Sequence, residues 1–179
     1  MGGSGAIGDI FSSILSKSKI HVNIVKGYLL PTTVNSETLV VIISVSGNTE
    51  ESLAIAESAY KKKCKIIGFS SGGKLLEFCK KNKIEHRIVT KYQSPRASFT
   101  SYFYTMLKVL HSLLNINQED IFESIKELEK KYEKINSSNL NKNNPSLNLA
   151  EWINNIPIIY YPLGLQAVAI RFKSVLQEN

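Results

Sequence analysis

The sequence lacks any apolar run that approaches the ~20 residues needed to cross a bilayer. Its first residues also lack the basic region and apolar core of a signal peptide. Cysteine is scarce, and the two thiols, Cys64 and Cys79, have neither metal-ligand spacing nor a nearby histidine partner. These absences exclude a membrane-spanning helix, a disulfide framework and a cysteine-based metal site. They predict a cytoplasmic protein whose cysteines are reduced and structural.

Acidic residues are fewer than basic ones, with 15 against 22 and a formal net charge of +7 at pH 7. An excess of positive charge can indicate a nucleic-acid partner. The lysines are instead scattered along predicted helix faces, as in 61–65 and 126–134, and interleaved with glutamates. We therefore expect a solvated surface, with neither nucleic acid nor a membrane as partner. The hydrophobic content, 43% of 179 residues, is ordinary for a globular chain with one core.

A strand, a short polar turn and a helix follow one another near the middle of the first half. The apolar residues 39–43 predict a strand buried on both faces, as in a parallel sheet. After Ser44, the turn 46–49 leads into a helix predicted over 49–62. The unpaired N–H groups and the dipole of a helix's first turn favour an anion. An ordinary capped helix has the same pattern, so both interpretations stay open at this point.

The residues of that turn have the chemistry of a phosphate site. Ser44, Ser46 and Thr49 supply hydroxyl donors. Gly47 permits a left-handed or closely approached backbone. Asn48 stands where the first residue of a capping box would stand, with a glutamate three residues later. We expect a phosphate monoester to suit this turn.

Strand and helix patterns alternate through the first 135 residues. This alternation predicts an α/β fold, a three-layer αβα domain with a mostly parallel, doubly wound sheet and ligands at the carboxyl ends of the strands. Strands are predicted over 20–25, 39–44, 65–70 and 84–90, and helices over 6–15, 49–62, 75–79, 99–113 and 117–135.

The remaining residues predict a second unit. An asparagine- and serine-rich stretch, 136–146, reads as a linker or exposed loop. It is followed by a helix over 147–155, a strand over 157–161 and a helix over 165–178. We expect a first domain over 1–135 that lacks its first strand, and a second domain over 147–179 that is only beginning.

Four motifs, GGSG, SVSGNTEES, SSGG and SPRAS, occur in this order. Together they resemble the archaeal-type bifunctional phosphoglucose/phosphomannose isomerases of the sugar isomerase (SIS) superfamily, over nearly the whole chain. The serine-rich core is common to many SIS proteins, whereas the GGSG start, the Pro-Arg pair and the late Arg-x-Lys with Gln-Glu-Asn are more specific. The resemblance implies a SIS fold and a homodimer with active sites near the subunit interface, and it implies neither cofactor nor metal.

The same resemblance implies an activity and assigns residues to it. The substrates would be glucose 6-phosphate and mannose 6-phosphate, interconverted with fructose 6-phosphate. Glu178 matches the catalytic base that moves a proton between C2 and C1 through a cis-enediol. Arg96 would reach the substrate from the start of its helix and stabilise developing negative charge. The implied substrate-binding residues are Gly3, Ser4, Ser44, Ser46, Gly47, Asn48, Thr49 and Arg96.

By resemblance, a histidine that assists ring opening and a lysine that acts as an acid would lie beyond residue 179, so the chain by itself is expected to be inactive. None of His21, His86 and His111 is predicted to replace that histidine, and each reads as structural. Tyr161-Pro162 departs from the glycine-rich turn expected after the second-domain strand.

Two other functions stay open from the sequence. A sugar-phosphate sensor or regulatory SIS module would keep the phosphate turn and perform no chemistry. An amino-sugar or pentose-phosphate isomerase of the same superfamily would share the turn, although the Pro95-Arg96 pair and the segment 171–178 favour the first reading. The sequence does not distinguish glucose from mannose preference.

Overall fold

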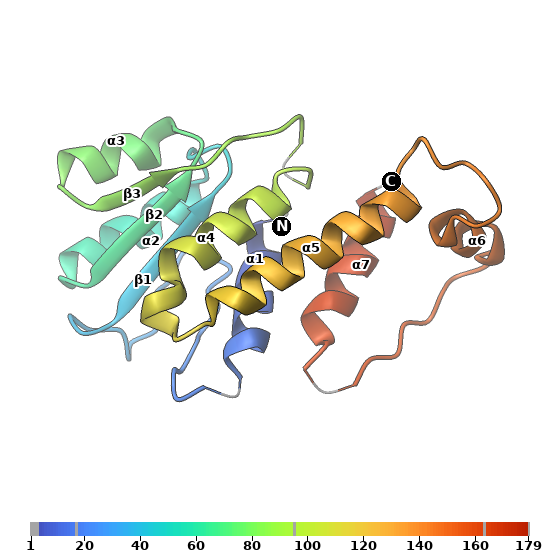
Figure 1. Cartoon of the computed structure of the whole chain (residues 1–179). Coiled ribbons are helices and arrows are strands. Elements are labelled where there is room, and N and C mark those ends of the chain that lie inside the picture. The colour runs from blue at the N-terminus through green and yellow to red at the C-terminus, as the bar shows by residue number, and fades with distance from the viewer. Residues whose placement is uncertain (1–3, 17, 95, 163, 179) are drawn as a thin grey trace.

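In the computed structural model of the chain, three parallel strands form one sheet in the order β1-β2-β3 (Figure 1). The strands are β1 Leu39–Ser44, β2 Lys65–Ser70 and β3 Glu85–Ile88. Ser44 pairs with Ser70, so the first two strands end level at their carboxyl ends. Short apolar segments joined by helical crossovers favour this parallel arrangement. The predicted parallel α/β sheet is confirmed, and the third strand is shorter than the predicted 84–90.

The structure describes residues 4–16, 18–94, 96–162 and 164–178, and for Ser4 and Glu178 it describes the backbone alone. Within these ranges, none of the helices is long and apolar enough to cross a bilayer.

Helices cover both faces of the sheet. On one face lie α2 Glu50–Lys61 and α3 Gly73–Lys81, and on the other lie α1 Ser4–Leu15 and α4 Phe99–Leu114 (Figure 1). Because side chains alternate along a strand, β1 contributes to both cores. The predicted three-layer arrangement is therefore confirmed.

Two apolar clusters hold these layers together. Val40 and Ile42 of β1 point to the α2 and α3 side, and Ile67 and Phe69 of β2 to the α1 and α4 side. Ala56 and Ala59 of α2 are completely buried, and their small side chains let that helix lie close to the sheet. The first cluster also contains Ile55, Ala56, Ala59, Leu75 and Cys79, and the second contains Ile7, Phe11, Val45, Val89, Tyr102, Met106, Leu107 and Leu110.

Three further helices lie outside the sheet layers: α5 Gln118–Ile135, α6 Pro145–Trp152 and α7 Gln166–Glu178. Asparagine side chains cap two of them, since Asn117 accepts from the backbone at the start of α5 and Asn144 at the start of α6. Helix α5 packs on α4, and α7 packs on α1. Large apolar side chains of α5 remain exposed, among them Phe122, Leu128, Tyr132 and Ile135.

Two predicted strands, 20–25 and 157–161, are not formed. Neither stretch has a ladder partner among the described residues. The first packs its side chains on α1 instead, where Ile24 lies 3.1 Å from the position that a Cβ of Gly8 would take. The second is exposed, with 89% of Tyr160 accessible. An extended apolar segment becomes a strand only when a neighbouring strand accepts its hydrogen bonds.

Lysines occupy the left-handed position that follows α2 and α3. Lys63 has φ of 57° and Lys83 has φ of 54°. After each, a backbone N–H donates to a carbonyl in the last helical turn, from Cys64 to Ala59 at 3.0 Å. Glycine is the usual residue at this position, because it lacks the Cβ that opposes positive φ.

Replacing Lys63 or Lys83 with glycine is therefore expected to stabilise the protein by about 1 kcal/mol each. Urea unfolding of each variant gives the free energy of unfolding that checks this. The matched control is Lys126→Gly, an exposed position in the interior of α5, which should cost about 1 kcal/mol. Destabilisation by either of the first two changes would contradict the expectation.

Candidate functional site

Two loops lie side by side at the carboxyl end of the sheet, because β1 and β2 are neighbours that end level. We call residues 45–49 the first loop and residues 71–73 the second loop. The backbone N–H of Ser71 donates to the carbonyl of Val45 at 3.2 Å, and its hydroxyl donates to the same carbonyl at 2.7 Å. The N–H of Leu75 donates to the carbonyl of Gly47 at 2.9 Å. The second loop and the start of α3 therefore support the first loop.

Gly47 is required by this contact between the loops. Its φ is +72°, and a Cβ placed on it would lie 1.8 Å from the carbonyl oxygen of Gly72. No side chain fits at that distance, and positive φ disfavours every other residue. The predicted left-handed, closely approached glycine is therefore present.

The three predicted hydroxyls do not share one environment. Ser44 is 1% exposed, and its Oγ lies 2.8 Å from Oγ1 of Thr49 and accepts from the N–H of Gly47 at 3.1 Å. Ser46 and Thr49 are exposed. The Oγ of Ser46 accepts from the N–H of Asn48 at 3.2 Å. Ser46 and Thr49 thus lie at the surface of the turn, and the hydroxyl of Ser44 is buried beneath Thr49.

The start of α2 differs from the predicted capping box. Thr49, not Asn48, is the N-cap residue, so that prediction is wrong. The amide oxygen of Asn48 accepts instead from the N–H of Lys74 in α3, at 3.0 Å. The hydroxyl of Thr49 contacts Ser44. Within the described residues it accepts no capping hydrogen bond from the first turn of the helix. The first-turn N–H groups of α2 therefore remain available to an external anion.

Two carboxylates, Glu50 and Glu51, occupy the first turn of α2. They stabilise the positive end of the helix dipole when no anion is bound. They are exposed or half-exposed, so solvent and salt screen their repulsion of a bound anion. The groups of this turn that could approach an anion closely are therefore its N–H groups and hydroxyls.

Arg96 lies in the turn that precedes α4. The guanidinium of Arg171 in α7 donates to the backbone carbonyl of Arg96 at 3.5 Å and lies 4.9 Å from the ring centroid of Phe99. These contacts join α7 to the start of α4. The polar contacts thus place the segment that contains Arg96 beside the helix that ends in Glu178.

The start of α1 lies in the same region. Figure 1 shows α1 and α7 running antiparallel, and the two helices pack together, so the start of α1 and the end of α7 lie at the same end. The predicted residue Gly3 lies outside the described residues, and the side chains of Ser4 and Glu178 are not described. Tyr102 of α4 connects this region to the first loop, since its hydroxyl donates to the carbonyl of Val45 at 3.2 Å.

Burial raises the pKa of Tyr102 to about 12, and a hydrogen bond with Ser71 partly offsets that rise. The phenol therefore stays neutral, as a buried donor must. Burial likewise raises the pKa of the Cys79 thiol. Cys64 and Cys79 are both free. An unreactive, structural thiol at Cys79 follows from its buried environment.

One residue of this region, His86 in β3, was not predicted to take part. Its Nε2 lies 2.8 Å from Oγ of Ser70, the last residue of β2. Burial, and secondarily the charge of Lys80, lowers the pKa of His86. Gly68 stands beside it in the register, and a Cβ there would lie 2.9 Å from Cδ2 of His86. A glycine inside a predicted strand was the sequence signal for this close approach.

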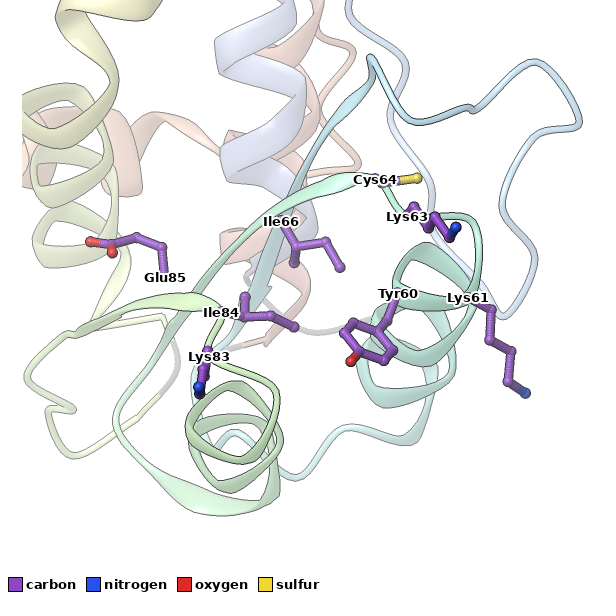
Figure 2. A pocket seen from close by; sticks show the side chains of 8 residues that line it. All are labelled: Tyr60, Lys61, Lys63, Cys64, Ile66, Lys83, Ile84 and Glu85. Atoms are coloured by element: carbon purple, nitrogen blue, oxygen red, sulfur yellow. The ribbon is translucent and has the colours of Figure 1, made fainter.

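A hollow of about 590 Å³ lies at the opposite, amino end of β2 and β3 (Figure 2). Tyr60, Ile66 and Ile84 point toward one another there, while Lys61 points away (Figure 2). The carboxyl ends of α2 and α3 lie beside it, and their dipoles disfavour an anion. The described residues contain no cluster of three His, Cys, Asp or Glu side chains that could hold a metal.

Comparison with known proteins gives matches over the whole chain. It is 36% identical over 188 residues to a bifunctional phosphoglucose/phosphomannose isomerase of Caldicellulosiruptor bescii, covering 100% of this chain and 54% of that protein. It is 33% identical over 183 residues to the protein of the same name from Thermoplasma acidophilum, covering 100% and 53%. A D-glucosamine-6-phosphate 4-epimerase of Sulfolobus acidocaldarius is 28% identical over 182 residues, covering 100% and 55%. No family model matches the chain.

The chain thus spans about half the length of the curated relatives it matches. The resemblance that the four motifs predicted, to bifunctional phosphoglucose/phosphomannose isomerases, is confirmed.

Proposed function

We infer that this chain carries the sugar-phosphate-binding part of an aldose-ketose isomerase that acts on glucose 6-phosphate, mannose 6-phosphate and fructose 6-phosphate. One observation carries the proposal: the start of α2 has no side-chain cap from Thr49, and its turn presents exposed hydroxyls at the carboxyl end of a parallel strand. Parallel α/β sheets bind ligands at this edge.

In the proposed complex the phosphate dianion lies at the first turn of α2. The N–H groups there supply partial positive charge, and the hydroxyls of Ser46 and Thr49 donate to the phosphate oxygens. Ser44 holds Thr49 from below, as the 2.8 Å contact between their hydroxyl oxygens suggests. Gly47 and Asn48 act through the backbone shape of the loop and its contact with α3.

The proposed chemistry is a proton transfer within the open-chain sugar. A carboxylate at Glu178 removes the proton from C2 of the aldose, and the C2 electron pair forms the double bond of a cis-enediol as the C1 carbonyl oxygen takes a proton from water. The same carboxylic acid returns its proton to C1, while the hydroxyl at C2 gives its proton back to water and becomes the ketone, so that no net proton is gained or lost. Arg96, Gly3 and Ser4 are proposed to contact the sugar phosphate, with Arg96 stabilising negative charge.

The arrangement of the helices supports these roles. Helix α7, which ends in Glu178, contacts the turn that carries Arg96 through Arg171. Seven residues separate Arg171 from Glu178, or about 10 Å along the helix. The end of α7 therefore lies about two helical turns from the residue that contacts the turn carrying Arg96.

We also propose that the segment 147–179 belongs to a second domain in the longer protein, and that this protein is a homodimer. The extended segment before α7 exposes large apolar side chains, with Ile156 93% and Tyr160 89% accessible. A strand in a second sheet would bury them. A native gel or a sedimentation measurement on the longer protein determines the oligomeric state.

Replacing Ser46 and Thr49 together with alanine is expected to weaken binding of fructose 6-phosphate by about 1 to 3 kcal/mol, because two donors to a dianion are lost. The measurement is calorimetric or NMR titration of this chain with the sugar phosphate. Ser36→Ala, an exposed serine remote from the first loop, is the matched control and should bind as the unsubstituted chain does.

Unchanged affinity in the double variant would place the phosphate elsewhere. Failure of the unsubstituted chain to bind would overturn the proposed site. Competition by inorganic phosphate, glucose 6-phosphate and glucosamine 6-phosphate would show whether the ester or the sugar is recognised. The D-glucosamine-6-phosphate 4-epimerase among the similar proteins makes the amino sugar a necessary comparison.

A further inference from the structure

A short hydrogen-bond relay connects β3 to the second loop beneath the phosphate turn. The hydroxyl of Ser70 is fully buried and lies 2.8 Å from Nε2 of His86. The same hydroxyl donates to the carbonyl of Gly72 at 2.8 Å and accepts from the N–H of Gly72 at 3.3 Å. The relay therefore runs from the histidine ring through one serine to one loop carbonyl.

The number of protons determines the direction of the relay. A serine hydroxyl has one proton, and a carbonyl can only accept. When Ser70 donates to Gly72, its oxygen must accept from the ring, so Nε2 of His86 carries a proton. Nδ1 of His86 is then the unprotonated nitrogen, and it is buried without a hydrogen-bond partner among the described residues. A neutral ring with the proton on Nε2 satisfies every contact of the relay.

The carbonyl that this relay holds is the one that meets the first loop. A Cβ on Gly47 would lie 1.8 Å from the carbonyl oxygen of Gly72, so these two backbones are in close contact. Ser71 and Leu75, on either side of that carbonyl, donate to the first loop through their backbone N–H groups. A rotation of the peptide at Gly72 would therefore change the position of Gly47 and the start of α2.

We propose that His86 is a positioning residue of the phosphate site, which holds the Gly72 carbonyl through Ser70 and so sets the backbone of the first loop. This inference rests on the proposed function, because it assigns His86 to the same site. His86 does not touch the ligand and performs no proton transfer in the reaction. Its effect reaches the phosphate through three backbone and side-chain contacts.

The surroundings of the ring are consistent with a neutral, oriented imidazole. Gly68 leaves room for the ring, and Sγ of Cys79 in α3 also lies close, 3.0 Å from the same Cβ position. Lys80 of α3 places a positive charge nearby, which with burial lowers the pKa of His86. Cys79 has a raised pKa and stays a neutral thiol. Among the described residues, Ser70 is the hydrogen-bond partner of Nε2, and none of these neighbours competes for it.

Two substitutions separate the role of the Nε2 donor from the role of ring packing. His86→Gln keeps a donor at the position of Nε2, whereas His86→Leu keeps a similar volume without a donor. We expect His86→Leu to weaken binding of fructose 6-phosphate about threefold to tenfold, as for the loss of one hydrogen bond, and His86→Gln to stay within about twofold. Thermal unfolding of both variants shows that the fold is retained, and His21→Leu, an exposed histidine, is the matched control.

Equal affinity in all three variants would overturn the proposal, and so would equal weakening by leucine and glutamine, because the donor would then not be the cause. If His86→Leu does not fold, Ser70→Ala interrupts the same relay and must reduce affinity to a similar extent. Affinity unchanged by Ser70→Ala would also overturn the proposal.

Nitrogen NMR of the unliganded chain tests the relay independently of any ligand. The ring of His86 should carry its proton on Nε2 at neutral pH, and the amide resonances of Gly47 and Gly72 should shift in His86→Leu and return in His86→Gln. A proton on Nδ1, or unshifted glycine amides, would overturn the relay. If the unsubstituted chain binds no sugar phosphate, the proposed function fails, while these NMR results still decide whether His86 sets the loop.

Discussion

Replacing Gly47 with alanine is expected to destabilise the protein by about 2 to 5 kcal/mol and to abolish binding of sugar phosphate. Alanine at φ of +72° costs about 1 to 2 kcal/mol. Its Cβ would also lie 1.8 Å from the Gly72 carbonyl oxygen, and separating the two loops adds about 1 to 3 kcal/mol. The clash is with backbone, so no side-chain rotation relieves it. Urea unfolding and a titration with fructose 6-phosphate measure the two effects.

Two other glycines provide graded controls for this substitution. A Cβ on Gly27 meets nothing within 4 Å, and the φ of Gly27 is not in the left-handed range, so alanine there should change stability by less than about 0.5 kcal/mol. Gly72 has φ of +148° and also has open space, so its substitution costs conformational strain of about 1 to 3 kcal/mol. The expected destabilisation is smallest at Gly27, larger at Gly72 and largest at Gly47. A loss at Gly47 no larger than that at Gly27 would show that the loops are not in contact.

Replacing Glu178 with glutamine is expected to reduce isomerase turnover about 10²- to 10⁴-fold while leaving sugar-phosphate affinity within about twofold. The amide of glutamine keeps the shape of the side chain and removes the group that accepts the proton from C2. Turnover is measured on a protein that extends over the full length of the relatives, because this chain spans about half of it. Glu133→Gln, an exposed glutamate in α5, is the control for loss of one carboxylate.

The same assay distinguishes the proposed functions. Unaltered turnover in Glu178→Gln would remove Glu178 as the base. No turnover by the unsubstituted protein, with binding retained, would favour a sugar-phosphate sensor. Conversion of glucosamine 6-phosphate in place of glucose 6-phosphate would favour an amino-sugar enzyme. Exchange of the C2 proton with solvent, followed by NMR, reports the enediol directly.

The local pattern predicted the elements whose cause is local. The strands 39–44 and 65–70 are found at these bounds, because short β-branched runs bounded by glycine and serine turns specify a buried parallel strand. The helix predicted over 117–135 is found with Asn117 as its cap. Gly47 was identified because few other residues adopt a turn of that shape before a helix.

The errors concern residues whose partner lies elsewhere in the chain. Asn48 was predicted to cap its own helix, and its amide oxygen instead accepts from Lys74, 26 residues later. Residues 20–25 and 157–161 have strand composition, and no neighbouring strand among the described residues pairs with them. His86 read as an ordinary strand residue, since its partner Ser70 belongs to another strand.

The sequence by itself determined the three paired strands and the order of the helices, the position of the polar turn before α2, and the likeness to sugar-phosphate isomerases. Periodicity and turn chemistry act between residues that are close in the chain. Only the tertiary structure decided which hydroxyls reach the surface, which residue caps α2, and how Ser70 and His86 support the first loop. Those features depend on hydrogen bonds between segments that meet when β1, β2 and β3 align. The pattern of residues along the chain does not indicate which distant hydrogen-bond donors and acceptors become neighbours.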